Sequence, residues 1–305
     1  MMQLKNLSFS SSCTLHTCPR KFELTKLIPK FSREESIHTT YGKVVGEAVQ
    51  AVFANVKSRT AIVMDMFLNW NLSLLEEDSK SRKSFYYAVI ALDKFIALHR
   101  AEFYDYEVAK FKGKPATELS MRIDLGDGFF LRGFADVILY HGTRGMYKVA
   151  EIKTTGSRYV IEAQYKNSPQ AVGYSTILDA ISEKFQYKYD SSYEISYIVY
   201  KTYLMEWEHL PFPKSKLERA KWIKNVLLDK EEIQKGIKQG YFPMHGESCS
   251  AFGRPCKFFD LCTLSNHALV PPNEMYEEQL ERERPANFAF NFSINDLIEV
   301  QLEDI

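Results

Sequence analysis

Two carboxylates and a lysine occur at a strand-like spacing in the middle of the chain. Asp136 lies in Gly-Phe-Ala-Asp-Val-Ile-Leu, and Glu151 and Lys153 lie in Val-Ala-Glu-Ile-Lys-Thr-Thr. Because side chains two residues apart on a strand point the same way, Glu151 and Lys153 share one face. If Asp136 faces the same side, two carboxylates converge beside one ammonium group.

Such a trio is suited to metal-dependent chemistry on phosphate esters. Mg²⁺ prefers oxygen ligands and commonly takes one or two carboxylates. A bound metal lowers the pKa of a water, and Lys153 could orient that water or stabilise the transition state. A Glu-x-Lys pair is also an ordinary feature of an exposed strand. Glu151, however, is flanked by apolar residues at 149, 150 and 152, where a carboxylate is costly unless a cation uses it.

Three further polar residues are candidates for the same site. Glu118 opens the first strand of the hairpin that precedes Asp136. Gln170 and Tyr174 lie one turn apart on a helix that follows Lys153, so their side chains point the same way. The pair alone would mean little, since any helix supplies such spacings.

The elements that position these residues follow from the hydrophobic periodicity. Helical spacing predicts helices at 10–29, 40–56, within 61–106, 168–184 and 214–239. Alternation predicts strands at 118–124, 129–133, 136–140, 147–153 and 193–200. Strands that run together and are flanked by helices indicate a mixed α/β fold.

The formal net charge of zero, from 39 basic and 39 acidic residues, is the balance of two oppositely charged parts. Residues 271–305 contain nine acids and two bases, so the remaining chain carries the compensating positive charge. A basic body favours nucleic acid as a partner, and the acidic tail could moderate that affinity. The tail is expected to be flexible, to dock on a single-strand-binding or recombination protein, or to cover the basic groove.

Composition excludes several other classes of protein. A hydrophobic content of 45% with 14% aromatics is too high for a disordered chain. No apolar run is long enough to cross a membrane, and residues 1–12 lack the features of a signal peptide. We therefore expect a cytoplasmic protein with no membrane partner, in which cysteines are ligands or buried thiols.

The five cysteines suggest a second chemical site. Cys249, Cys256 and Cys262 have six and five residues between them, and Cys18 begins Cys-Pro-Arg-Lys-Phe. Among Cys18, Cys249, Cys256 and Cys262 no pair has the short spacing of a zinc knuckle, whereas an iron-sulfur cluster needs four cysteines and tolerates varied loops. Simple packing of the cysteines in the core is the alternative. Cys13 is left over, as a buried thiol or a competitor of Cys18.

The segments Gly-Phe-Ala-Asp136, Glu151-Ile-Lys153-Thr-Thr and Gln170-Ala-Val-Gly-Tyr174 together resemble the PD-(D/E)xK nuclease superfamily. The resemblance is to the branch of RecB-type nuclease domains and of phage and CRISPR-associated exonucleases. It implies a restriction-endonuclease-like sheet flanked by helices, Asp136 and Glu151 as metal ligands, and Lys153 as a catalytic residue. It also implies that the Gln170–Tyr174 helix completes the active site, with Glu118 as an upstream acid and metal ligand.

The same resemblance implies a 4Fe-4S cluster. In this branch one cysteine in an N-terminal Cys-Pro motif and three cysteines near the C-terminus hold the cluster, which corresponds here to Cys18, Cys249, Cys256 and Cys262. The cluster would close the first helix onto the C-terminal iron-sulfur segment, in a structural role.

One position departs from the family pattern. Members often carry a metal-binding histidine in a Gly-x3-His context before the core, and the stretch from Tyr41 to Glu47 has Gly46 there. Either Glu47 substitutes for the histidine, or the site works with fewer ligands.

The helical part before the hairpin interleaves bases with aromatics. Such a mixture could grip a single strand, or it could be an ordinary amphipathic helix. In the related branch this region forms an arch over the site, which would favour DNA ends. The residues concerned are Lys80, Arg82, Lys83, Lys94, Arg100, Phe85, Tyr86, Tyr87, Phe95, Phe103 and Tyr104.

These features predict five regions and one function. The regions are an N-terminal helix at 1–30, a helical region at 31–112, a nuclease core at 113–240, an iron-sulfur segment at 241–270 and a flexible acidic tail at 271–305. The predicted function is a Mg²⁺- or Mn²⁺-dependent DNA exonuclease of recombination, repair or replication, in a prokaryotic or phage-infected cell. A catalytically weak DNA-binding accessory protein and a zinc-stabilised nucleic-acid-binding module are the alternatives.

Overall fold

The computed structural model describes residues 6–27, 36–71, 82–111, 113–184, 192–251, 254–256, 258–259, 262 and 290–302. The chain divides into two compact units. The first comprises Met1–Arg33, Ser120–Gly133 and Ala220–Ile298, and the second comprises Glu34–Leu119, Phe134–Arg219 and Glu299–Ile305. Two strands, β5 and β6, contribute residues to both units.

The strands form a mixed sheet in the order β12-β5-β6-β7-β8-β9. The pairs β6/β7 and β8/β9 are antiparallel, while β7/β8 and β12/β5 are parallel. Together with the helices that flank it, this sheet confirms the mixed α/β class predicted from the sequence. The strands are β5 (Thr117–Gly126), β6 (Phe129–His141), β7 (Met146–Thr155), β8 (Ser192–Lys201), β9 (Glu206–Ser215) and β12 (Phe290–Ser293).

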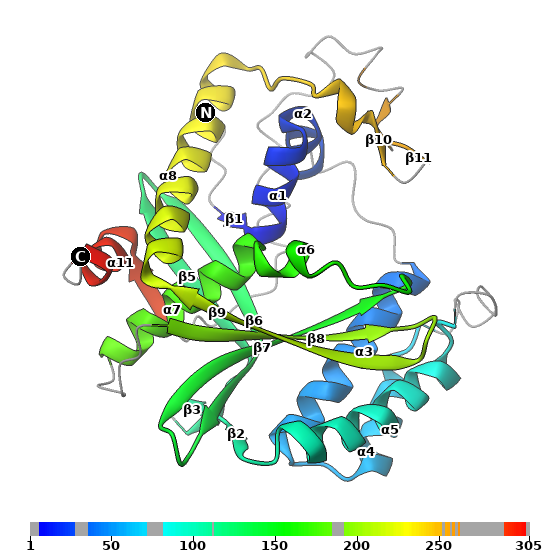
Figure 1. Ribbon diagram of the computed structural model, residues 1–305. Helices are drawn as coiled ribbons and strands as arrows, with labels where there is room; N and C mark the ends of the chain where they lie inside the picture. The colour runs from blue at the N-terminus through cyan, green and yellow to red at the C-terminus, as the bar shows by residue number, and fades with distance from the viewer. Residues whose placement is uncertain are drawn as a thin grey trace. The chain divides into compact units, whose positions relative to one another are not determined.

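In the second unit, two helices pack on one face of the sheet and a third packs on one of them, and the three lie together beside β8 in Figure 1. They are α3 (Ile37–Ala54) and α5 (Phe85–Glu102) on the sheet, and α4 (Arg59–Leu68) on α3. The apolar stripes of α3 and α5 pack with Ala150 and Ile152 of β7 and with Ile198 of β8. Because strand side chains alternate, Glu151 and Lys153 point to the opposite face. Helices α6 (Glu162–Lys166) and α7 (Pro169–Lys184) follow β7 in the chain.

Two short antiparallel pairs complete the described strands of this unit. Strand β2 (Tyr106–Val108) pairs with the end of β6, and β3 (Lys110–Phe111) pairs with β4 (Lys114–Pro115).

In the first unit, β1 (Asn6–Ser8) pairs in parallel with β6. Helix α1 (Phe9–Thr17) is tied to the long helix α8 (Lys216–Gln239) through Asp229, which accepts hydrogen bonds from Ser12 and from His16, the latter at 2.6 Å. Lys230 of α8 donates to the carbonyl of Leu125 at 2.8 Å and to Asp127 at 2.7 Å. The remaining short elements are α2 (Pro19–Phe22), η1 (Glu23–Leu27), η3 (Gly246–Cys249), β10 (Ser250–Ala251) and β11 (Arg254–Pro255).

The helix predicted at 10–29 is broken in the structure. Cys18 has an extended backbone, with φ −163° and ψ 110°, between α1 and α2. The ring of Pro19 disfavours a helical conformation at the residue before it and is well placed at the first helical position, so the chain ends one helix and starts another. The break determines where the Cys18 side chain lies.

Two strand predictions were also wrong in detail. The strands expected at 129–133 and 136–140 are one continuous strand, β6. Strand β9 was not predicted, because Pro211 and Pro213 interrupt its pattern. Proline is tolerated in edge strands, and β9 lies at the end of the sheet path.

Several aromatics of the helical region belong to the core. Phe95 and Phe103 are fully buried, and Lys83 is buried with its ammonium 2.9 Å from Nδ1 of His38. For these residues the amphipathic-helix interpretation holds and the strand-gripping one is wrong. Tyr86 and Tyr104 are exposed, and Lys80 lies outside the described residues.

No helix among the described residues has the length and apolar character needed to span a bilayer.

Part of the acidic tail is folded. Strand β12 pairs with β5, and α11 (Ile294–Leu302) follows it directly. Phe290, Phe292, Ile294 and Leu297 are buried. These apolar side chains contribute to the first unit, whereas residues 271–289 lie outside the described part of the chain.

Candidate active site and cysteine cluster

Asp136 and Glu151 meet where the ladder between β6 and β7 ends. The last paired residues are Val137 and Ala150. Beyond them the backbone N–H of Ile152 donates to Oδ2 of Asp136, at 2.7 Å, so a side chain replaces the missing strand partner. The aspartate thereby lies next to Glu151, on the sheet face opposite the α3 and α5 core.

Glu151 is almost completely buried, with 1% of its surface exposed. Its Oε1 accepts hydrogen bonds from Nζ of Lys153 and, at 2.7 Å, from Nε2 of Gln170. Its Oε2 is buried and has no hydrogen-bond partner among the residues that the structure describes. A buried carboxylate oxygen without a donor is costly and marks a place for a cation.

Gln170 and Tyr174 of α7 position the Glu151 side chain through hydrogen bonds. Nε2 of Gln170 also lies 2.9 Å from the Tyr174 hydroxyl, which donates to the carbonyl of Phe134 on β6. Tyr174 is 1% exposed, so it cannot touch a substrate. The pair therefore fixes the distance between β6, β7 and α7.

Glu118 lies near the other carboxylates but is held separately. Its Oε1 accepts from Nε2 of Gln50 on α3 at 2.9 Å, and its backbone has a left-handed φ of 48°. A non-glycine residue rarely adopts this conformation, which carries strain that functional sites often retain. Its charge contributes to raising the pKa values of Asp136 and Glu151.

The ionisation states follow from burial and mutual repulsion. Burial, and then repulsion from Glu151, raise the pKa of Asp136 well above its ordinary value. Burial also raises the pKa of Glu151, against the opposing attraction of Lys153. For Lys153, burial lowers the pKa, but Glu151 and Asp136 outweigh it and the net pKa is raised. Lys153 is therefore protonated at neutral pH.

This donor set fits a divalent cation. Two adjacent carboxylates repel each other, and one buried oxygen is unpartnered, so a cation between them would relieve both costs. Across the described residues, however, no three His, Cys, Asp or Glu side chains are close enough together to hold a metal by themselves. Of the three carboxylates expected as ligands, Asp136 and Glu151 are adjacent. Glu118 lies near them but is hydrogen-bonded to Gln50.

Helix α3, which lacks the family histidine, packs on the opposite face of β7 and contacts the candidate site through Gln50, which donates to Glu118. Gly42, Gly46 and Gln50 recur every four residues on one face of α3. A Cβ on Gly42 would lie 3.3 Å from the Thr154 hydroxyl, and Gln50 binds Glu118. A Cβ on Gly46 would meet nothing within 4 Å.

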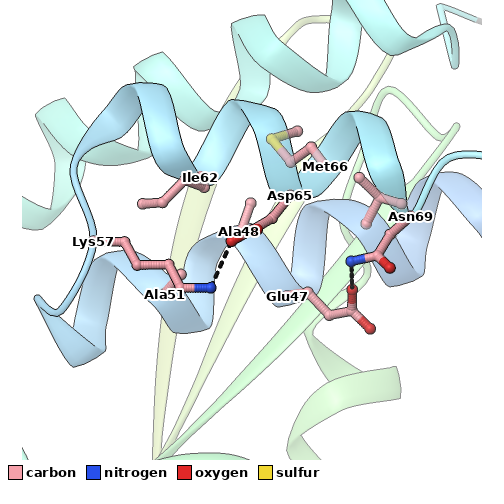
Figure 2. Close-up of a pocket in the computed structure, with 9 residues that line it drawn as sticks. Glu47, Ala48, Ala51, Lys57, Ile62, Asp65, Met66 and Asn69 are labelled. Carbon is pink, nitrogen blue, oxygen red and sulfur yellow. Dashed lines mark hydrogen bonds and ion pairs between the residues drawn. The ribbon is translucent and has the colours of Figure 1, made fainter.

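Glu47 does not take the place of that histidine. It lines a separate pocket between α3 and α4, where its Oε2 accepts from Asn69 at 3.4 Å (Figure 2). Lys57 and Asp65 form an ion pair at 2.6 Å across the same pocket (Figure 2). Glu47 is one position further around the helix than Gly46, which turns its side chain away from Thr154.

Four of the five cysteines line a single pocket in the first unit. These are Cys18, Cys249, Cys256 and Cys262. The segment is closed by a hydrogen bond from the Cys256 N–H to the Cys249 carbonyl, at 2.6 Å. Cys13 does not line this pocket, and it is exposed, although it was expected to be buried.

The thiols of the cluster influence one another. Burial raises the pKa of Cys262, and the neighbouring Cys256 and Cys18 add to the rise. Arg20 opposes it through charge and a hydrogen bond to the thiol. All five cysteines are free thiols. Four cysteines are the ligand number of an iron-sulfur cluster, although no three of the described thiols lie close enough together to hold a metal ion as they stand.

Sequence reasoning missed Gln50 and Arg20. The signal for Gln50 was its position eight residues after Gly42, two turns along the same helix face. The signal for Arg20 was its place in Cys-Pro-Arg. In each case the partner, Glu118 or Cys262, is far away in sequence.

A mixed sheet that presents Asp136, Glu151 and Lys153 side by side is the arrangement of a nuclease. The chain belongs to the PD-(D/E)XK nuclease superfamily, whose family model matches residues 6–263. Nucleases of this superfamily typically use divalent metals such as Mg²⁺, and the fold indicates DNA as the substrate.

Comparison with solved structures gives more distant likenesses. One is a protein from Eubacterium rectale named as a candidate exonuclease, with 14% identity and a TM-score of 0.47, covering 87% of this chain and all of the other. Another is SSO0001, with 14% identity and a TM-score of 0.30, covering 76% of this chain and 78% of the other. Neither is similar enough to bear on activity. No curated protein matches the chain.

Proposed function

We propose that the protein is a Mg²⁺- or Mn²⁺-dependent deoxyribonuclease that acts as an exonuclease at DNA ends. The observation that carries the proposal is the unpartnered, buried Oε2 of Glu151 beside Asp136 and Lys153. Asp136 and Glu151 would hold the metal, and Glu118 is near enough to influence their charge. When bound, the metal would supply a water of lowered pKa and neutralise charge on the scissile phosphate.

The chain's own residues then have distinct roles. Lys153 is protonated in the metal-free site, and its charge would stabilise the negative charge that develops on the phosphate oxygens. Gln170 holds Oε1 of Glu151, which leaves Oε2 available as the oxygen that would hold a metal. Tyr174 fixes Gln170 and the end of β6.

Lys153→Ala is expected to slow DNA hydrolysis by about 10²–10³-fold, because a preorganised charge aimed at the transition state is worth that much. End-labelled single- and double-stranded DNA with Mg²⁺ or Mn²⁺ would measure it. Lys94→Ala, which removes an exposed lysine from α5, is the control. Equal degradation by wild type and Lys153→Ala would contradict the proposed site. Products shortened from one end would support the exonuclease assignment, and internal cuts would contradict it.

Gly46→His is expected to lower the Mn²⁺ concentration for half-maximal activity by about tenfold, because it adds an imidazole ligand at an open position on the helix face that holds Gly42 and Gln50. Gly46→Ala is the matched control, since it fills the same space and improves helix propensity without adding a ligand. An unchanged Mn²⁺ requirement in Gly46→His would show that this face of α3 does not reach the metal.

We further propose a 4Fe-4S cluster on Cys18, Cys249, Cys256 and Cys262. The convergence of these four cysteines on one pocket supports it, as does the exclusion of Cys13. It would place the protein in the RecB-like branch, whose members include phage and CRISPR-associated exonucleases. Roles in recombination, repair or replication, a tail-bound partner protein, a cytoplasmic location and the five-region division remain part of this proposal.

A further inference from the structure

A group of basic and aromatic side chains lies just beyond the candidate catalytic strand. Strand β7 ends at Thr155, two residues after Lys153. The turn between β8 and β9 is fastened there, because Thr202 donates to the Thr155 carbonyl from its N–H at 2.8 Å and from its hydroxyl at 3.1 Å. Tyr203 follows Thr202, and Arg158 follows Thr155 by three residues.

Two arginine side chains pack against the ring of Tyr203. The guanidinium carbon of Arg158 lies 4.1 Å from the ring centroid, and that of Arg82 lies 5.4 Å from it. Arg158 also donates to the Tyr203 hydroxyl, and Arg82 donates to the Tyr203 carbonyl at 2.7 Å. The tyrosine thus orients both guanidinium groups.

These two charges are not neutralised by a carboxylate within the described residues. The acids of the same hairpin, Glu206 and Glu208, pair instead with Lys201, at 3.6 Å and 3.1 Å. Two like charges held near one ring repel each other unless an anion joins them. Arg82 also has a left-handed φ of 52°. Strain of this kind at a non-glycine residue is retained mainly at functional sites.

The same turn presents an exposed aromatic ring. Tyr159 is 80% exposed. Ser157 fixes its backbone, because the Ser157 hydroxyl donates to the Tyr159 carbonyl at 2.8 Å and accepts from the Tyr159 N–H at 3.3 Å. The N–H of Ser157 in turn donates to the Thr155 hydroxyl at 3.1 Å. The ring is therefore held in solvent by a defined turn.

We propose that Arg82, Arg158, Tyr203 and Tyr159 form a platform that binds a single DNA strand next to the catalytic site. The guanidinium groups bind phosphates, and Tyr159 stacks on an unpaired base. A duplex keeps its bases stacked on one another and offers Tyr159 no free face. The inference rests on the proposed function and deepens it, since it assigns the single strand as the form of DNA that reaches Lys153.

The platform lies only a few residues along the chain from Lys153. Arg158 lies five positions after Lys153, a span of at most about 18 Å when the chain is fully extended. A stacked strand carries one phosphate per about 3.4 Å, so a strand of a few nucleotides reaches from one to the other.

Binding of a fluorescent oligothymidine in EDTA, measured by anisotropy at several salt concentrations, tests the platform without cleavage. Tyr159→Ala is expected to weaken binding by about 10- to 100-fold with an unchanged salt slope, because stacking is not electrostatic. Arg158→Ala is expected to weaken binding and to reduce the slope by about 0.7, the contribution of one phosphate contact on a single strand. Both residues are exposed, so folding should be retained.

Matched controls lie at the far end of α5. Arg100→Ala removes an exposed arginine about 22 Å along α5 from Phe85, and Tyr104→Ala removes a 74% exposed tyrosine two residues past the end of that helix. If the platform is the binding site, both variants bind as the wild type does. Wild-type affinity in both Tyr159→Ala and Arg158→Ala would overturn the platform. An equal loss for duplex and single strand would overturn the single-strand assignment.

The experiments can refute the nuclease proposal and the platform proposal independently of each other. If the wild type degrades DNA with Mg²⁺ while the platform variants bind oligothymidine normally, the platform is wrong and the nuclease stands. If the wild type degrades nothing while Tyr159→Ala and Arg158→Ala lose binding, the platform stands and the nuclease is wrong.

Discussion

Asp136→Asn is expected to abolish metal-dependent DNA hydrolysis while leaving the metal-free protein at least as stable as the wild type. The asparagine carbonyl can still accept the hydrogen bond from the Ile152 N–H, which Asp136 accepts at 2.7 Å. It removes a carboxylate whose charged form is opposed by burial and by Glu151. Activity therefore falls, because a metal ligand is lost. Stability does not fall, because the repulsion between the two carboxylates is relieved.

The same variant changes the dependence of stability on pH. The folded-state pKa of Asp136 lies above its ordinary value of about 3.9. The folded state therefore holds the proton more tightly than the unfolded state, and in EDTA this group's contribution to stability falls as pH rises from about 4 toward the raised pKa. Asp136→Asn should remove that fall, so its melting temperature should change less between acidic and neutral pH.

Thermal melts in EDTA and in Mg²⁺, together with nuclease assays, would measure these effects. Mg²⁺ should stabilise the wild type and have little effect on Asp136→Asn, because ligand binding to the folded state raises stability by mass action. Asp65→Asn is the control, since Asp65 lies in the pocket between α3 and α4 and pairs with Lys57. Substantial activity in Asp136→Asn, or a marked loss of its stability in EDTA, would refute the assignment.

Cys18→Ser is expected to abolish iron binding and to destabilise the first unit. Cys18 lines the same pocket as the three C-terminal cysteines, so a cluster there cross-links α1 and α2 to the segment that follows α8. In the chain-entropy model, closing a loop of about 230 residues contributes about 5 kcal/mol to the free energy of unfolding. A loss of that order would lower the yield of folded protein and the melting temperature together.

Cys13→Ser is the matched control, because Cys13 is exposed and does not line the pocket. Protein purified anaerobically would be assayed for iron, sulfide, zinc and visible absorption. Brown wild-type and Cys13→Ser proteins with a colourless Cys18→Ser would support the cluster. Zinc in place of iron would support the zinc-stabilised alternative, and equal iron in all three proteins would contradict the role of Cys18.

The orientation of side chains on β7 could be predicted from the sequence, because it depends only on the alternation of residues along a strand. Alternation placed Glu151 and Lys153 on one face and Ile152 in the core, and the structure has them so. The helix from 168 and the spacing of Gln170 and Tyr174 were equally local. The motifs also indicated the nuclease superfamily, which the family match confirms.

Errors arose where distant residues or prolines intervened. The helix at 10–29 breaks at Cys18 because of Pro19, a local rule that the apolar spacing concealed. Strand β9 was hidden by two prolines that only an edge position permits. Phe95 and Phe103 were weighed as stacking surfaces, yet the sheet buries them.

The sequence by itself determined the class of fold, the side-chain types of the candidate catalytic set and the four cysteines that could share a ligand. Only the tertiary structure decided that Asp136 caps the Ile152 N–H, that Glu151 keeps one oxygen unpartnered, and that Tyr203 gathers Arg82 and Arg158. The physical reason is that period and propensity act over a few residues. Convergence of groups from separate segments depends on how the strands pair and on what packs across them.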